Sequence, residues 1–157
     1  MRDAAVGIDI GTTSIKAIVV DSEARVLFEN SIPHELISER SGFAEEDAEE
    51  WWVHIKRLLS AIANDVEVTR IAGLGFCGMV PTLILLDDKG VPLGHSIQQN
   101  DARAVREMES WRTKLDIDSY FARTGNTINQ QLIFPKYEWL VARQPEISEK
   151  TRTVLGS

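Results

Sequence analysis

The chain has a single cysteine, and its acidic residues outnumber its basic ones. With Cys77 alone among 157 residues, no internal disulfide can form, and a reducing cytoplasm fits such a chain. Cys77 itself is expected to be a small buried hydrophobic residue rather than a nucleophile. The 24 Asp and Glu residues against 17 Lys and Arg give a net charge of -7. This charge argues against broad nucleic-acid binding, which requires a basic surface.

Long apolar runs are also missing from the sequence. No stretch approaches the roughly 18 apolar residues of a membrane-spanning helix, and the N-terminus shows no signal-peptide pattern. We therefore expect no membrane segment. The sequence has an ordinary globular balance, with 43% hydrophobic and 26% charged residues, and it is long enough for one domain with a sizeable core.

The first half of the sequence predicts mostly β-structure. Residues 6–10 alternate between apolar and other side chains, and apolar strands are predicted at residues 15–21 and 26–32. Connections this short predict an antiparallel meander rather than a βαβ unit. Residues 71–76 and 83–86 predict a fourth and a fifth strand.

Helices are predicted between and after these strands. Asp47 fits an N-cap with Glu50 three positions later, an acidic variant of the capping box. The following helix carries one apolar stripe that should pack on the sheet, made of Trp51, Trp52, Ile55, Leu58, Leu59 and Ile62. Further helices are predicted over residues 101–115 and from Pro135, in a first turn, to Arg143.

The segment from Gly7 to Lys16 carries the most chemical information. Asp9 lies near the end of a strand, and Gly11 permits a tight turn with close backbone approach to a ligand. Thr12 and Thr13 then offer hydroxyl and N–H donors, which can hold phosphate oxygens, and a carboxylate beside them suits Mg²⁺. An ordinary surface hairpin with a polar turn is the competing interpretation. A P-loop is excluded, because the sequence contains no G-x-x-x-x-G-K-[ST].

Residues 73–78 match the G-x-G-x-x-G pattern of dinucleotide-binding proteins, but their context differs. That pattern must open a helix after a strand, whereas here Pro81 and the strand-like residues 83–86 follow. We interpret the glycines as a strand end that allows close backbone packing.

The segment from Gly7 to Lys16 resembles the first phosphate motif of the actin, hexokinase and heat-shock-protein ATPase superfamily. Within it the chain resembles the FGGY carbohydrate kinases, most of all the xylulokinase-like members. The matching pieces cover almost the whole chain in family order: Gly7–Lys16, Gly42–Trp52, Ile71–Leu93, Asn100-Asp101-Ala102-Arg103, Thr124-Gly125-Asn126 and Pro135-Lys136. The resemblance implies an α/β, ribonuclease-H-like (actin-like ATPase) layer, with a mixed five-stranded sheet and helices on its faces.

The resemblance also implies ATP-dependent phosphorylation of a sugar or polyol, with a ketose such as a pentulose favoured. Gly11, Thr12 and Thr13 would then face the β- and γ-phosphates of ATP. Asp9 would organise Mg²⁺ through water, and Lys16 would either reach phosphate or point to solvent.

Family members contact their substrate in two places, which correspond here to Met79, Val80 and Pro81, and to Asn100, Asp101 and Arg103. The first place departs from the family. Xylulokinases have Gln-Met-His-Gly where this chain has Met79-Val80-Pro81-Thr82, and the Arg-Glu pair of glycerol kinases is missing too.

The second place keeps its polar residues but has Gln99 where the family has tryptophan. Arg103 is expected to orient Asp101 or the loop by a charge-assisted bond. For Asp101, capping of a helix is an equally good interpretation as ligand contact. These departures argue against assigning D-xylulose or glycerol as the substrate.

The family's catalytic aspartate and adenosine-binding domain lie later in the chain than residue 157. We therefore expect residues 1–157 to be an incomplete N-terminal FGGY kinase domain that is inactive alone, and the resemblance allows a homodimer of the full-length protein. The alternatives are another sugar kinase of the superfamily, or a non-catalytic sugar-sensing or interaction domain on the same fold. The three histidines, His34, His54 and His95, are widely separated and have no metal-ligand spacing.

Overall fold

The computed structural model describes residues 2–156, which form two compact units. The first unit contains the residues up to Leu36 together with residues 47–79, and the second contains residues 37–46 and those from Val80 onward. The chain therefore enters the second unit briefly, returns to the first, and then completes the second.

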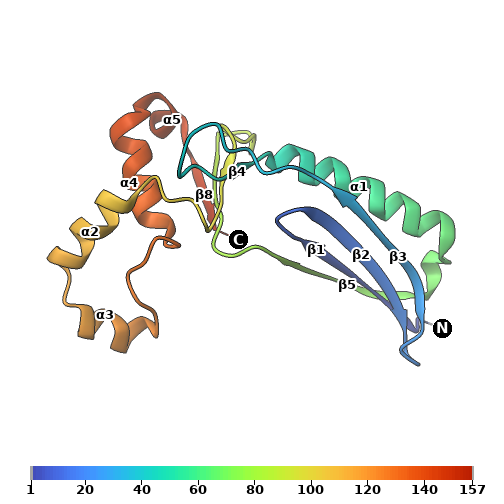
Figure 1. The fold of residues 1–157 in the computed structure, drawn as a ribbon. Coiled ribbons are helices and arrows are strands. Elements are labelled where there is room, and N and C mark those ends of the chain that lie inside the picture. The colour runs from blue at the N-terminus through green and yellow to red at the C-terminus, as the bar shows by residue number, and fades with distance from the viewer. Residues whose placement is uncertain (1, 157) are drawn as a thin grey trace. The chain divides into compact units, whose positions relative to one another are not determined.

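The sheet of the first unit has the strand order β3-β2-β1-β5 among the described residues. Its strands are β1 (Ala4–Ile10), β2 (Ser14–Asp21), β3 (Val26–Pro33) and β5 (Ile71–Gly78). The first three pair antiparallel, which confirms the predicted meander, and β5 pairs parallel to β1 (Figure 1). The parallel pairing requires a crossover, which helix α1 (Ala48–Asp65) and a 3₁₀ turn at Val68–Arg70 provide.

Helix α1 packs against one face of this sheet. As predicted, Asp47 is the N-cap, and its carboxylate accepts the N–H of Glu49. The side chains buried in this interface are Trp51, Ile55, Leu58 and Ile62 from the helix and Val6, Ile8, Ile15, Ala17 and Val19 from the strands. Each large aliphatic side chain contributes about 1.5–3 kcal/mol by leaving water. Trp52, which the apolar stripe included, is instead 58% exposed.

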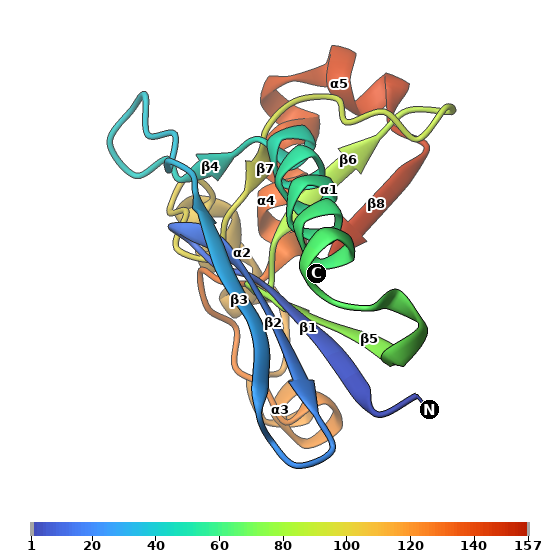
Figure 2. The ribbon, with the colours of Figure 1, turned by 90° about the vertical axis from the view of Figure 1, so that its right-hand side faces the viewer.

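The second unit contains a separate antiparallel sheet with the order β4-β7-β6-β8. Its strands are β4 (Glu45–Glu46), β7 (Ser96–Ile97), β6 (Leu83–Leu86) and β8 (Thr153–Gly156) (Figure 2). Its helices are α2 (Val105–Lys114), α3 (Ile117–Thr124), α4 (Ile133–Arg143) and α5 (Pro145–Lys150). Leu83, Leu85, Ile97 and Leu140 form its buried cluster.

The α/β fold class is confirmed, but two details of the prediction were wrong. The predicted fifth strand, β6, does not join the first sheet, since it pairs with β7 and β8 and buries Leu83 and Leu85 against α4. The helix predicted from Asp101 begins only at Val105, and the Asp101 carboxylate accepts the N–H groups of Ala44 and Arg103. Pro135 lies in the first turn of α4 as expected. Among residues 2–156 no helix is both long and apolar enough to cross a membrane.

Candidate functional site

The turn between β1 and β2 is a tight hairpin with an exposed tip. The last strand pair is Ile10 with Ile15, and the N–H of Gly11 donates to the carbonyl of Ser14 at 3.1 Å. A Cβ at Gly11 would lie 3.2 Å from that carbonyl oxygen, so a side chain there would crowd the turn. Thr12 and Thr13 are exposed at the tip. The tip thus presents backbone and hydroxyl donors to solvent.

Asp9 lies at the base of this tip, between two side chains from neighbouring strands. The cross-strand register places Lys16 and Cys77 opposite it. The Lys16 Nζ lies 3.8 Å from the Asp9 Oδ2, and the Cys77 thiol donates to the Asp9 Oδ1 at 3.3 Å. The ion pair is exposed, so its net stabilisation is small and Lys16 can turn to another anion. The Asp9 carboxylate remains half-exposed.

Cys77 was predicted to be buried, and this prediction was wrong. Its side chain is exposed, and the hydrogen bond to Asp9 raises the pKa of the thiol above its ordinary value. A raised thiol pKa disfavours the nucleophilic thiolate. Cys77 lies beside Asp9 because β5 pairs parallel to β1, a register that no local signal in the sequence indicates.

The face of the sheet that carries Asp9 is open within the first unit. Asp9, Lys16 and Cys77 line a broad hollow of about 830 Å³, together with Gly7, Ile8, Ala17, Ile18, Glu29, Asn30, Ser31, Gly75 and Phe76. The half-exposed carboxylate of Asp9 belongs to the lining of this hollow.

His34 supports the hairpin tip from within the first unit. Its backbone N–H donates to the carbonyl of Thr13 at 3.1 Å, and its ring is buried, with 8% of the residue exposed. The ring stacks on His54 of α1 with centroids 6.4 Å apart, and the His54 Nε2 lies 3.7 Å from Glu50. The sequence showed no spacing that would bring these two histidines together.

We expect His34 to make the first unit sensitive to acid. Burial lowers the pKa of His34 below its ordinary value, although the Gly11 backbone and Glu50 act to raise it. The unfolded chain therefore binds more protons, so stability decreases as pH falls below about 6.5. In His34→Gln, the thermal unfolding temperature should decrease less than in the wild type between about pH 7.5 and pH 5.5. An equal decrease would contradict this, and His95→Gln, at a half-exposed position, is the matched control.

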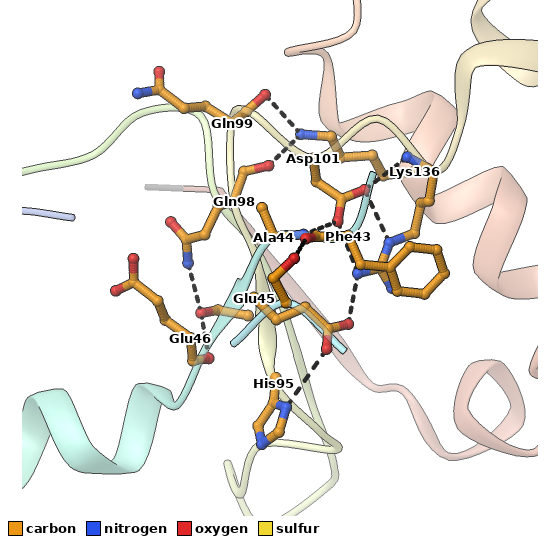
Figure 3. A network of polar contacts seen from close by, with 12 residues as sticks. Phe43, Ala44, Glu45, Glu46, His95, Gln98, Gln99, Asp101 and Lys136 are labelled. Atoms are coloured by element: carbon orange, nitrogen blue, oxygen red, sulfur yellow. Dashed lines mark hydrogen bonds and ion pairs between the residues drawn. The ribbon is translucent and has the colours of Figure 1, made fainter. Parts of the chain in front are cut away.

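Asp101 lies at the centre of a buried polar network in the second unit (Figure 3). Arg103 belongs to the same network. Asp101 is 1% exposed, and its carboxylate accepts bonds from the Arg103 side chain at 2.9 and 2.8 Å. It also accepts the backbone N–H groups of Ala44 at 2.7 Å and of Arg103 at 2.9 Å. Arg103 makes the charge-assisted bond that the sequence led us to expect, and it also donates to Glu45 at 2.6 Å.

The guanidinium of Arg103 is held by aromatic rings as well. Its Cζ lies 4.0 Å from the centroid of the Phe43 ring and 5.2 Å from that of Trp139. Burial acts to lower the pKa of Arg103, but the bonds to Asp101 and Glu45 raise it overall, so the group stays charged. The burial of Asp101 and the four bonds that its carboxylate accepts from Ala44 and Arg103 indicate a structural role for this carboxylate.

The other predicted substrate residues are more accessible. Val80 is 60% exposed, Asn100 is exposed, and Pro81 is half-buried. These three belong to the second unit, whereas Met79 and the hairpin tip belong to the first. Within the second unit, a hydrogen bond of 3.3 Å from Thr82, next to Pro81, to Gln98 links the two predicted substrate segments.

Solved sugar kinases share this architecture. The structure of a xylulose kinase from Rhodospirillum rubrum matches with a TM-score of 0.93 and 37% sequence identity, covering 98% of this chain and 32% of that one. The fold is therefore the actin-like ATPase fold of carbohydrate kinases. Residues 4–157 match the profile of the FGGY family of carbohydrate kinases, N-terminal domain, and the chain belongs to that family.

Curated relatives agree with this assignment. The xylulose kinase of Staphylococcus xylosus is 31% identical over 135 residues, and that of Bacillus subtilis (strain 168) is 29% identical over 155 residues. These matches cover 86% and 96% of this chain but only 28% and 30% of the relatives. The chain therefore spans less than a third of the length of these relatives.

Proposed function

We propose that the full-length protein carrying this chain phosphorylates a sugar or polyol with ATP, and that a ketose such as a pentulose is its substrate. Membership of the carbohydrate kinase family supports the reaction class. The similarity to xylulose kinases supports the ketose. The observation that carries the proposal is the hairpin tip, where exposed donors lie beside the half-exposed carboxylate of Asp9.

In this proposal the tip binds the phosphates of ATP. The backbone N–H groups and hydroxyls of Thr12 and Thr13 would donate to the β- and γ-phosphate oxygens. Gly11, whose N–H is bound by the Ser14 carbonyl, would shape the turn that faces the phosphates. The Lys16 ammonium, 3.8 Å from Asp9, would turn to a phosphate oxygen. Donors placed in this way orient the phosphoryl group and stabilise its charge.

Asp9 fits a Mg²⁺ site of the kind found in kinases. Magnesium is commonly bound by one or two carboxylates, with water and phosphate completing its octahedron, and it neutralises charge on the transferring group. Among residues 2–156 no three His, Cys, Asp or Glu side chains gather to hold a metal by themselves. We therefore assign to Asp9 the task of holding the ion through water beside the tip.

For the sugar, we propose contacts from Met79, Val80, Pro81 and Asn100. Pro81 has no N–H to donate, so this place would contact the substrate through apolar surface and carbonyl groups. We assign Asp101 and Arg103 to holding the segment that carries Asn100, because the carboxylate already accepts four bonds.

The test is an assay of ATP consumption by the full-length protein with Mg²⁺ and a panel of ketoses, alditols and aldoses. We expect turnover that depends on one class of sugar, with a ketose the best substrate, and no turnover by residues 1–157 alone. Sugar binding without turnover would instead indicate a non-catalytic sugar-binding protein. Turnover by the isolated chain would overturn the expectation that it is inactive alone.

A further inference from the structure

Lys136 is a lysine with no exposed surface, and its ammonium is bound by main-chain carbonyl groups. It lies on α4 and is 0% exposed. Its Nζ donates to the carbonyl oxygen of Gln98 at 2.6 Å and to that of Gln99 at 3.3 Å (Figure 3). Burying an ammonium group is costly unless it is well hydrogen-bonded, so a packing role alone does not explain this side chain.

The main chain of Gln98 takes part in several of the hydrogen bonds that hold the segment from Gln98 to Asp101. Its carbonyl also accepts the backbone N–H of Asp101 at 3.1 Å, and the N–H of Gln98 donates to the carbonyl of Ala44 at 2.9 Å. The segment from Gln98 to Asp101 is therefore held from α4 and from Ala44, the residue just before β4. Asn100, which is exposed, is carried between these fixed points.

The Gln98 side chain extends this support to the other substrate segment. It is 0% exposed, and its amide donates to the Ser96 hydroxyl at 2.9 Å. Its carbonyl oxygen accepts the hydroxyl of Thr82 at 3.3 Å, and Ser96 donates to the carbonyl of Glu46 at 2.7 Å. Thr82 directly follows Val80 and Pro81. One buried polar chain thus connects the segment after β7 with the segment before β6.

We propose that Lys136 and Gln98 are positioning residues that hold residues 80–81 and 99–100 in register for a polyhydroxylated substrate. This inference rests on the proposed sugar kinase function. Neither residue touches the substrate, and both act by fixing the main chain of the two segments. An apolar replacement of Lys136 leaves the Gln99 carbonyl without its bond, and the segment that carries Asn100 loosens.

The charge of Lys136 offers a readout that needs no mutation. Burial, together with Arg103, lowers the pKa of Lys136 to about 8, and Asp101 opposes this shift. Asp101 and Arg103 are the charged groups that act on it. As pH rises through this value, the ammonium loses its proton and the clamp weakens, so the KM for sugar of the wild type should rise on the alkaline side while that for ATP stays flat.

The experiment compares Lys136→Met and Gln98→Leu with wild type in the full-length protein. Lys114→Met, at an exposed position on α2, is the matched control. We expect the KM for sugar to rise about tenfold in both test variants, from the loss of buried hydrogen bonds, while the KM for ATP changes less than about twofold. A merely structural role would lower the amount of active enzyme, and hence kcat, but leave both KM values unchanged.

Two outcomes would overturn the inference. One is a folded Lys136→Met protein whose KM for sugar equals that of the wild type. The other, which applies even if the variants do not fold, is a wild-type KM for sugar that stays constant across the alkaline range. If the wild type phosphorylates no sugar, the proposed function fails. In that case, hydrogen exchange at the Asp101 amide tests whether Lys136 holds the segment from Gln98 to Asp101. Faster exchange in Lys136→Met would support this role, and unchanged exchange would contradict it.

Discussion

Replacing Asp9 with alanine is expected to lower the kcat of the full-length protein at least about a hundredfold, because charge stabilisation by a bound metal contributes several kcal/mol. Asp9 is the half-exposed carboxylate at the base of the hairpin tip, and its side chain contacts Lys16 and Cys77. In the proposed function, its loss would remove the group that holds Mg²⁺ and pairs with Lys16 beside the phosphates. The measurement is sugar-dependent ATP consumption at several Mg²⁺ concentrations.

Two comparisons make this prediction specific to the metal. Asp9→Asn keeps the shape of the side chain and removes its charge. Its kcat should fall nearly as far as that of Asp9→Ala, and its remaining activity should require a higher Mg²⁺ concentration. Asp65→Asn, at an exposed position near the end of α1, makes the same chemical change away from the hairpin and should leave kcat unchanged. If Asp9→Ala retained most of the wild-type kcat at ordinary Mg²⁺, the assignment of the ion to Asp9 would be refuted.

The hairpin could be predicted from the sequence because its determinants are local. Apolar alternation over residues 6–10, a break at Gly11 and a second apolar run fix two strands and the turn between them. The N-cap Asp47 and the stripe of α1 are local in the same sense. Such signals involve residues a few positions apart, so they can be recognised without knowledge of the tertiary fold.

The features that the sequence did not reveal all depend on long-range pairing. Cys77 reaches Asp9 only through the parallel register of β1 and β5, and His34 meets His54 only because α1 packs on the sheet. Strand β6 was assigned to the wrong sheet because its partner β8 lies about seventy residues later. The periodicity of apolar residues identifies a strand or a helix, but it does not identify the strand or helix that it pairs with.

Asp101 shows the same limit at the level of a single side chain. The sequence offered Asp101 as the cap of a helix predicted over residues 101–115, and a family motif offered it as a ligand for sugar hydroxyls. In the structure its carboxylate binds Arg103, as expected, and it also accepts the N–H of Ala44, which is 57 positions away. The bonds from Arg103 come from two positions along the chain, whereas the bond from Ala44 depends on the tertiary fold and could not be predicted from the sequence.

Arg103→Met is the second large effect that we expect, and it concerns stability. The Arg103 and Asp101 side chains are almost fully buried, so removing the cation leaves the Asp101 carboxylate unpaired away from water. Breaking a buried pair in this way costs about 3–5 kcal/mol of unfolding free energy. The contacts of the guanidinium with the rings of Phe43 and Trp139 are lost as well. Denaturant unfolding measures the change in unfolding free energy. Faster hydrogen exchange at the Ala44 amide, which donates to Asp101, would show that the loss of stability arises at this contact.

Three further variants separate the buried charge from other causes. Arg103→Lys keeps a charge but not the two-pronged bond to Asp101, so it should lie between wild type and Arg103→Met. Arg106→Met, at an exposed position on α2, should change stability by less than about 0.5 kcal/mol. The double variant Asp101→Asn with Arg103→Met should cost less than the sum of its single changes, because the asparagine leaves no buried charge behind. Costs that simply add, or an Arg103→Met variant as stable as the wild type, would show that the pair does not hold the segment before α2 in place.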